Sequence, residues 1–195
     1  MLKIAYDPIY KYKLPEGHRF PMIKYELIPE QLLYEGTVSA ENFFNPGPLD
    51  EASILLTHTL EYWQRLRDQQ LTEREIRAIG FPLTTQLVER SRTIANGTLQ
   101  CAFYAQQYGV AMNVAGGTHH AYAFRGEGFC CTNDIAVAAN YLLHHQLLKK
   151  ILVIDLDVHQ GNGTAHIFRN DPRVFTFSMH GAKNFPLRKE VSDLD

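Results

Sequence analysis

The segment that most constrains the fold lies at residues 151–163, where an apolar run meets acidic and histidine side chains and then a glycine turn. Ile151–Ile154 is apolar at every position, which is typical of a central parallel strand covered by helices on both faces. Side chains of an extended segment alternate between faces, so we expect Asp155, Asp157 and His159 to project to one side. Mixed oxygen and nitrogen ligands suit Zn²⁺, or Fe²⁺ or Co²⁺ at the same site, better than Ca²⁺ or Mg²⁺. The alternative is a strand end with solvated acidic side chains.

A second cluster of polar side chains follows another apolar strand candidate, at residues 110–115. Gly116–Gly117 comes next, and two glycines allow a sharp turn and a close approach of the backbone to a ligand. His119 and His120 are adjacent, so their rings should point in different directions and have separate roles. The other adjacent pair, His144–His145, lies in a predicted helix and is assigned no function.

Strand and helix patterns alternate along the chain. The strand candidates are residues 2–6, 110–115, 151–155 and 174–178. The longest predicted helix runs from about Thr84 to Tyr108, and another from about Asn133 to Leu148. This alternation predicts an α/β fold. The polar clusters follow the carboxyl ends of strands, where ligands bind in open α/β sheets.

Composition narrows the possible classes of function. With 195 residues, 45% of them hydrophobic, the chain can bury one substantial core, and we expect a single domain over residues 1–195. The net charge of −2 gives no basic field for binding nucleic acid. No apolar run resembles a signal peptide or membrane span, and the three cysteines suit a reducing compartment, so we expect a cytoplasmic protein that binds no membrane. No glycine-rich nucleotide-binding loop is present.

Three segments in this order resemble the histone deacetylase superfamily: Gly116–Ala121, Gly128–Asp134 and Asp155–Gly163. The third segment, with residues 178–195, looks most like the class IV, bacterial-type branch. The resemblance is strong over residues 110–195 and loose upstream. It implies an arginase-like, three-layer α/β/α fold with a mainly parallel sheet.

The resemblance also implies a chemistry and assigns roles to residues. The reaction would be zinc-dependent hydrolysis of the amide of acyl-lysine or of a small acylated amine. Asp157 and His159 would be metal ligands, and a bound metal acidifies water near neutral pH. His120 would be the general acid and base, and His119 the second imidazole, which stabilises developing charge.

Supporting residues follow from the same resemblance. Asp155 would orient His119, and Asn162 would be the hydrogen-bond partner of His120. Gly128 and Phe129 would form one wall of the acyl-lysine channel, and Phe185 the other. Phe129 could alternatively be an ordinary core residue.

A structural K⁺ or Na⁺ site is also implied, formed by backbone oxygens with one hydroxyl. Its residues would be Asp155, Asp157, His159, Ser178 and Met179.

Relatives in this superfamily carry a third metal ligand, an Asp, and a transition-state-stabilising Tyr in segments that would follow Asp195. We therefore expect a deacetylase-like domain without its C-terminal segment. A truncated, catalytically incompetent fragment with weak metal binding is one alternative, and an unrelated His/Asp metal-binding or phosphoryl-transfer protein is another. If Val174–Ser178 is left as an uncovered edge strand, the chain should self-associate.

Overall fold

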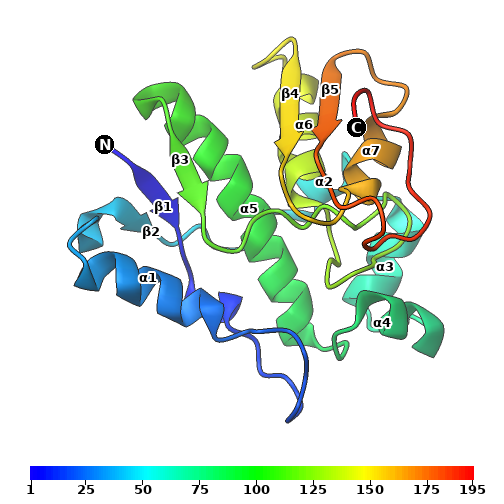
Figure 1. Cartoon of the computed structure of the whole chain (residues 1–195), viewed down its shortest axis with the longest axis horizontal. Helices are drawn as coiled ribbons and strands as arrows, with labels where there is room; N and C mark the ends of the chain where they lie inside the picture. The colour runs from blue at the N-terminus through cyan, green and yellow to red at the C-terminus, as the bar shows by residue number, and fades with distance from the viewer.

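The computed structural model describes residues 1–195 as helices joined to short parallel strands (Figure 1). The elements, in chain order, are β1 (Lys3–Ala5), η1 (Pro8–Tyr10), α1 (Lys24–Tyr34), η2 (Ala40–Asn42), β2 (Phe43–Phe44), α2 (Glu51–Leu55), α3 (Leu60–Arg67), α4 (Glu73–Ile79), α5 (Thr85–Tyr108), β3 (Ala111–Asn113), α6 (Asp134–His144), β4 (Ile151–Asp155), α7 (Asn162–Phe168) and β5 (Val174–Ser178). None of these helices is both long and apolar enough to cross a membrane.

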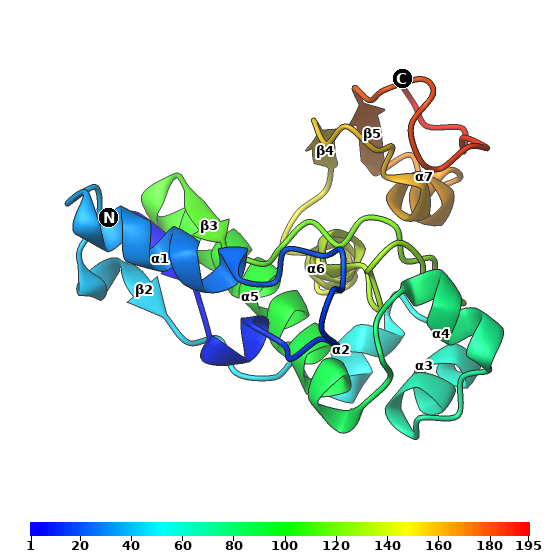
Figure 2. The ribbon, with the colours of Figure 1, turned by 60° about the horizontal axis from the view of Figure 1, so that its bottom comes forward.

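The strands form two parallel sheets instead of one. The first has the order β2-β1-β3, and the second consists of β4 and β5 in register from Ile151 opposite Val174 to Asp155 opposite Ser178. The β4–β5 sheet stands apart from β1 and β3 in the turned view (Figure 2). The predicted α/β class is therefore confirmed, with every strand pair parallel.

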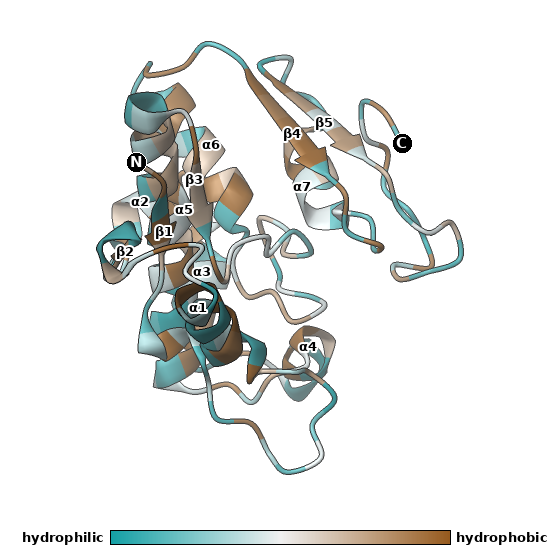
Figure 3. Ribbon diagram, turned by 60° about the vertical axis from the view of Figure 1, so that its left-hand side comes forward, coloured by the Kyte–Doolittle hydropathy of each residue, from teal (hydrophilic) through white to brown (hydrophobic).

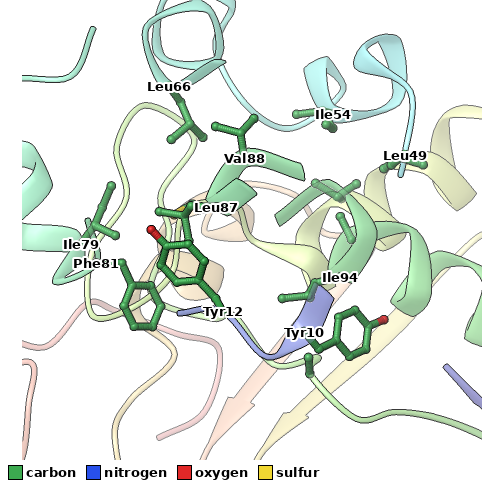
Figure 4. Packing of buried hydrophobic residues seen from close by; sticks show 14 of the residues in the cluster. Tyr10, Tyr12, Leu49, Ile54, Leu66, Ile79, Phe81, Leu87, Val88 and Ile94 are labelled. Atoms are coloured by element: carbon green, nitrogen blue, oxygen red, sulfur yellow. The ribbon is translucent and has the colours of Figure 1, made fainter. Parts of the chain in front are cut away.

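Helix α5 organises the larger of the two cores. Its predicted start and end are confirmed, since the Thr84 side chain caps the helix and Gly109 ends it. Buried residues of α5 and of the segments around it form a cluster of 22 side chains, part of which is shown in Figure 4. Gly97 lets α5 pack closely against η1 and β3, because a Cβ there would sit 2.6 Å from the Tyr10 hydroxyl and 2.8 Å from Asn113 Nδ2.

The smaller core lies beneath the β4–β5 sheet, where one face packs on α6 and α7. Val153 on that face is 8% exposed, whereas Leu152 and Ile154 on the other face are 59% and 58% exposed. The hydrophobic colouring of both strands is visible in Figure 3. The expectation that both faces of Ile151–Ile154 are covered is wrong in this structure, because all helices that contact β4 lie on one side.

The expectation that β5 has an uncovered edge is also wrong. Leu194 runs parallel to β5 beside Phe177, and its carbonyl accepts the Ser178 N–H at 3.0 Å. The Leu194 N–H in turn donates to the Thr176 carbonyl at 3.1 Å. β4 pairs only with β5, so the unpaired edge of this sheet belongs to β4.

Helix α6 begins as the sequence predicts but ends earlier. The Asn133 side chain caps it by accepting the Ala136 N–H, and the helix ends at His144 instead of Leu148. His144 and His145 lie at its exposed end, away from the two cores.

Candidate active site

One pocket of about 630 Å³ collects the residues that the sequence singles out. It is lined by the segment leading into α1, the end of α4, the loop after β3, the loop before α6, the turn after β4 and the segment after β5. The predicted site residues on its wall are His119, His120, Gly128, Phe129, Asp157, His159 and Phe185. Asp155 and Asn162 lie behind the two histidines, where they contact the rings from outside the pocket.

His119 is paired with a carboxylate. Its Nδ1 lies 2.6 Å from Asp155 Oδ2 at the carboxyl end of β4. A carboxylate accepts hydrogen bonds, so this contact places the proton of a neutral His119 on Nδ1 and leaves Nε2 as the unprotonated nitrogen. A Cβ at Gly161 would lie 2.3 Å from the same carboxylate oxygen. Glycine is therefore required for α7 to begin this close to the pair.

His120 is paired with an amide. Its Nδ1 lies 2.6 Å from Asn162 Oδ1 at the start of α7, and both side chains are buried. Burial lowers the pKa of His120 to about 4, helped by the neighbouring His119, while the hydrogen bond to Asn162 acts in the opposite direction. His120 is thus neutral near neutral pH. Gly128 allows this packing, because a Cβ there would lie 2.6 Å from His120 Cδ2.

Asp157 and His159 lie in a turn, not in an extended strand as the sequence predicts. β4 ends at Asp155, whose Oδ1 accepts the Asp157 N–H at 3.0 Å. Asp157 Oδ1 then accepts the His159 N–H at 2.7 Å. These short-range bonds compete with the strand ladder and turn the backbone. Both side chains still reach the pocket.

The donor chemistry of this turn fits a transition-metal ion. Asp157 Oδ1 and His159 Nδ1 are 3.0 Å apart. Burial raises the pKa of the Asp157 carboxyl, but the hydrogen bonds from His159 and the charges of His119 and His159 outweigh it, so the net shift is downward. An ionised carboxylate beside an imidazole is a donor pair that Zn²⁺ accepts. No group of three or more His, Cys, Asp and Glu side chains is arranged to hold a metal ion, so Asp157 and His159 stay a predicted donor pair.

Two phenylalanine rings line the pocket with the histidines. The Phe185 ring is 5.0 Å from the His120 ring and 6.4 Å from the His159 ring. Phe129 packs on Phe20 and Phe81, with ring centroids 5.0 and 5.1 Å away. Phe129 therefore belongs to both the pocket wall and the adjoining core. Its φ of 67° is rare for a residue with a side chain, and its N–H donates to the Ile79 carbonyl at 2.6 Å.

The residues predicted to hold a monovalent cation lie together where β4 and β5 end. The Asp155 carbonyl accepts the Met179 N–H at 2.9 Å. Ser178 is buried, and its hydroxyl lies 2.9 Å from His180 Nδ1. The role of these residues in cation binding stays a prediction.

Asn133 and Asp134 are supporting residues whose roles the sequence does not reveal. Asn133 Nδ2 donates to the Ala121 carbonyl at 3.1 Å and to Thr164 Oγ1 at 3.0 Å. These two bonds join the loop that carries His119 and His120 to α7. Asp134 accepts the Thr118 N–H and hydroxyl, both at 2.6 Å, and the Gly117 N–H at 3.1 Å. The only signal in the sequence is that both residues lie in the Gly128–Asp134 motif.

Comparison with known proteins agrees with this geometry. The sequence matches the histone deacetylase domain family over residues 18–195, and the chain belongs to that family. It is 44% identical over 192 residues to an uncharacterized protein of the cyanobacterium Picosynechococcus, covering 98% of this chain and 64% of that relative. It is 30% identical over 197 residues to the acetoin utilization protein AcuC of Staphylococcus aureus, covering 94% of this chain and 50% of AcuC.

Solved structures give the same result for the fold. The crystal structure of a histone deacetylase homolog from Aquifex aeolicus superposes with a TM-score of 0.82 at 28% identity, over 97% of this chain and 54% of that one. The arginase- and deacetylase-like fold is thereby confirmed. The chain spans between half and two thirds of the length of these relatives. Membership of this family excludes the alternative of an unrelated metal-binding or phosphoryl-transfer protein.

Proposed function

We propose that this pocket hydrolyses the amide bond of acyl-lysine or of a small acylated amine, with Zn²⁺ held by Asp157 and His159. One observation carries the proposal: two histidines, each fixed by a partner at 2.6 Å, face the same 630 Å³ pocket as the carboxylate and imidazole donor pair. A general base, a second imidazole and metal donors are groups that together can promote hydrolysis of an unactivated amide by water.

The metal would supply Lewis acidity, polarising the amide carbonyl and lowering the pKa of water at the site. Fe²⁺ or Co²⁺ could serve with the same donors. Asp157 Oδ1 and His159 Nδ1 are close enough to each other for both to bind one ion. The residues proposed for K⁺ or Na⁺ include the backbone oxygens of this same pair, together with Asp155, Ser178 and Met179, so a cation there would stabilise the ends of β4 and β5.

His120 is suited to take a proton from water. Its Nδ1 is held by Asn162, so Nε2 is the nitrogen available to the pocket, and burial keeps the ring neutral. The proton would then pass from Nε2 to the departing amine. His119, with Asp155 behind it, is suited to carry positive charge, because a carboxylate at 2.6 Å stabilises an imidazolium more than an amide does. We therefore assign His119 to charge stabilisation.

The aromatic walls support an acyl-lysine substrate. Phe129 and Phe185 both line the pocket, and an aliphatic lysine stem lying between them would bury apolar surface on both sides. The acyl carbonyl would then lie over the histidines and the donor pair.

Hydrolysis of an acetyl-lysine peptide in the presence of Zn²⁺ tests the proposal. His120→Ala should lower kcat/KM by at least about 100-fold, which is the lower range for a general base. His144→Ala, a change at an exposed histidine outside the pocket, is the matched control and should leave the rate unchanged. Turnover that does not depend on His120 would refute the assignment. A peptide that binds without any turnover would assign the pocket a binding role.

A further inference from the structure

The hydrogen bonds behind His120 continue past Asn162. Asn162 Nδ2 lies 3.1 Å from the Tyr122 hydroxyl, and that hydroxyl lies 3.1 Å from Glu190 Oε1. A chain of three hydrogen bonds thus leads from the His120 ring to a carboxylate on the segment after β5. Tyr122 and Glu190 carry no role in the chemistry described above.

The Glu190 carboxylate determines which atom donates and which accepts in each of these hydrogen bonds. A carboxylate only accepts, so the Tyr122 hydroxyl donates to Glu190 and its oxygen is left to accept from the Asn162 amide nitrogen. The other end of the amide, Oδ1, then faces His120 and can only accept. His120 must therefore donate from Nδ1. Burial and the hydrogen bond to Glu190 raise the pKa of Tyr122 to about 12, which keeps the hydroxyl proton in place.

Neighbouring side chains hold Tyr122 and Glu190 in position. Gln160 is fully buried, and its side-chain oxygen accepts the Glu190 N–H at 2.9 Å while its nitrogen donates to the Glu190 carbonyl at 2.8 Å. The guanidinium of Arg125 lies 3.5 Å above the Tyr122 ring. The backbone of Glu190 is therefore fixed independently of its carboxylate.

Glu127 is a weaker candidate than Glu190 for the carboxylate that ends this series of hydrogen bonds. Its Oε1 lies 3.5 Å from Asn162 Nδ2, at the limit of a hydrogen bond. Its other oxygen is bound by Arg125 at 3.2 Å, so the charge is already paired. Glu190 forms no ion pair and receives the hydroxyl of Tyr122 directly.

We propose that Tyr122 and Glu190 are positioning residues that, through Asn162, hold His120 with its proton on Nδ1 and its Nε2 free toward the pocket. Aligned hydrogen bonds in a buried chain strengthen one another, so loss of the last acceptor weakens the first bond. Without Glu190 the Tyr122 hydroxyl can rotate, the Asn162 amide can turn over, and His120 can be protonated on either nitrogen. The use of Nε2 as a base rests on the proposed function, whereas the tautomer itself does not.

Nitrogen-15 NMR of the histidine rings in the 195-residue chain tests this directly, with the His120 signals assigned by comparison with His120→Gln. Unchanged His120 should be protonated on Nδ1. Glu190→Ala, which removes the acceptor, and Tyr122→Phe should each lower the ratio of Nδ1–H to Nε2–H by about fivefold, the effect of losing about one neutral hydrogen bond. Glu73→Ala, a change at an exposed carboxylate on α4, should leave the ratio unchanged.

Two results would overturn the proposal: a wild-type His120 protonated on Nε2, or an unchanged ratio in both variants. If Tyr122→Phe fails to fold, Glu190→Ala decides, because Gln160 holds the backbone of residue 190 whichever side chain is present. Peptide hydrolysis in the same samples separates the two proposals. An altered tautomer ratio without hydrolysis would leave the positioning role standing and refute the proposed function.

Discussion

Lowering the pH should destabilise the fold through His58, a buried residue that does not line the pocket. His58 is 2% exposed, and its Nε2 lies 3.0 Å from the backbone nitrogen of Asn133, the residue that caps α6. A backbone N–H only donates, so Nε2 must be unprotonated in the folded protein. Protonating this nitrogen would break the bond that holds the start of α6 and the loop leading into it.

The size and sign of the effect follow from the pKa shift. Burial lowers the pKa of His58 from 6.5 to about 4, while the nearby backbone of Ala123 and Tyr122 acts in the opposite direction. Between these two pH values the unfolded chain binds a proton that the folded chain does not. The free energy of unfolding should thus be undiminished above about pH 6.5 and fall by about 3 kcal/mol as the pH approaches 4.

Urea denaturation at about pH 7.5 and about pH 4.5 measures this loss. Glutamine at position 58 does not titrate, and its oxygen can accept the Asn133 N–H. His58→Gln should therefore reduce the difference in stability between the two pH values by about 2 to 3 kcal/mol. The exposed His144→Gln is the control. An acid-induced loss as large in His58→Gln as in the wild type would refute the reasoning.

Three further changes test how the site is supported. Asn133→Ala should lower the free energy of unfolding by about 3 kcal/mol in urea denaturation, because it removes a helix cap and leaves buried groups without partners; a loss under about 1 kcal/mol would contradict this. Asp134→Asn should cost about 2 to 4 kcal/mol by the same measurement, since an amide offers donors to the Thr118 donors; an unchanged midpoint would show that the loop is held otherwise. Phe185→Ala should raise KM for an acetyl-lysine peptide about tenfold with little change in kcat or melting temperature, because the half-exposed ring contributes mainly to binding; a fall in kcat alone would place Phe185 in the chemistry.

Local patterns in the sequence identified the elements best. β4 and β5 were predicted with their observed bounds, and α5 to within one residue, because an uninterrupted apolar run and a capping threonine act over a few residues. The pair Gly116–Gly117 predicted a sharp turn, and Gly117 has a φ of 87°. The close approaches at Gly128 and Gly161, where a Cβ would strike His120 and Asp155, were not predicted.

Side-chain hydrogen bonds and strand pairing could not be predicted in the same way. The Asp157–His159 turn is set by side chains that accept the next N–H but one, which competes with the extended geometry that alternation implies. Glu190 reaches Tyr122 across 68 residues, and no periodicity records that contact. The division of the strands into two sheets likewise depends on pairing partners rather than on strand propensity.

Zinc binding by the Asp157 and His159 pair is the most direct test of the account. Isothermal titration of the 195-residue chain with Zn²⁺ should show binding that the double change Asp157→Ala with His159→Ala abolishes and that His144→Ala leaves intact. A double variant that binds Zn²⁺ as tightly as the wild type would contradict the assignment of the metal donors, and with it the proposed hydrolytic site.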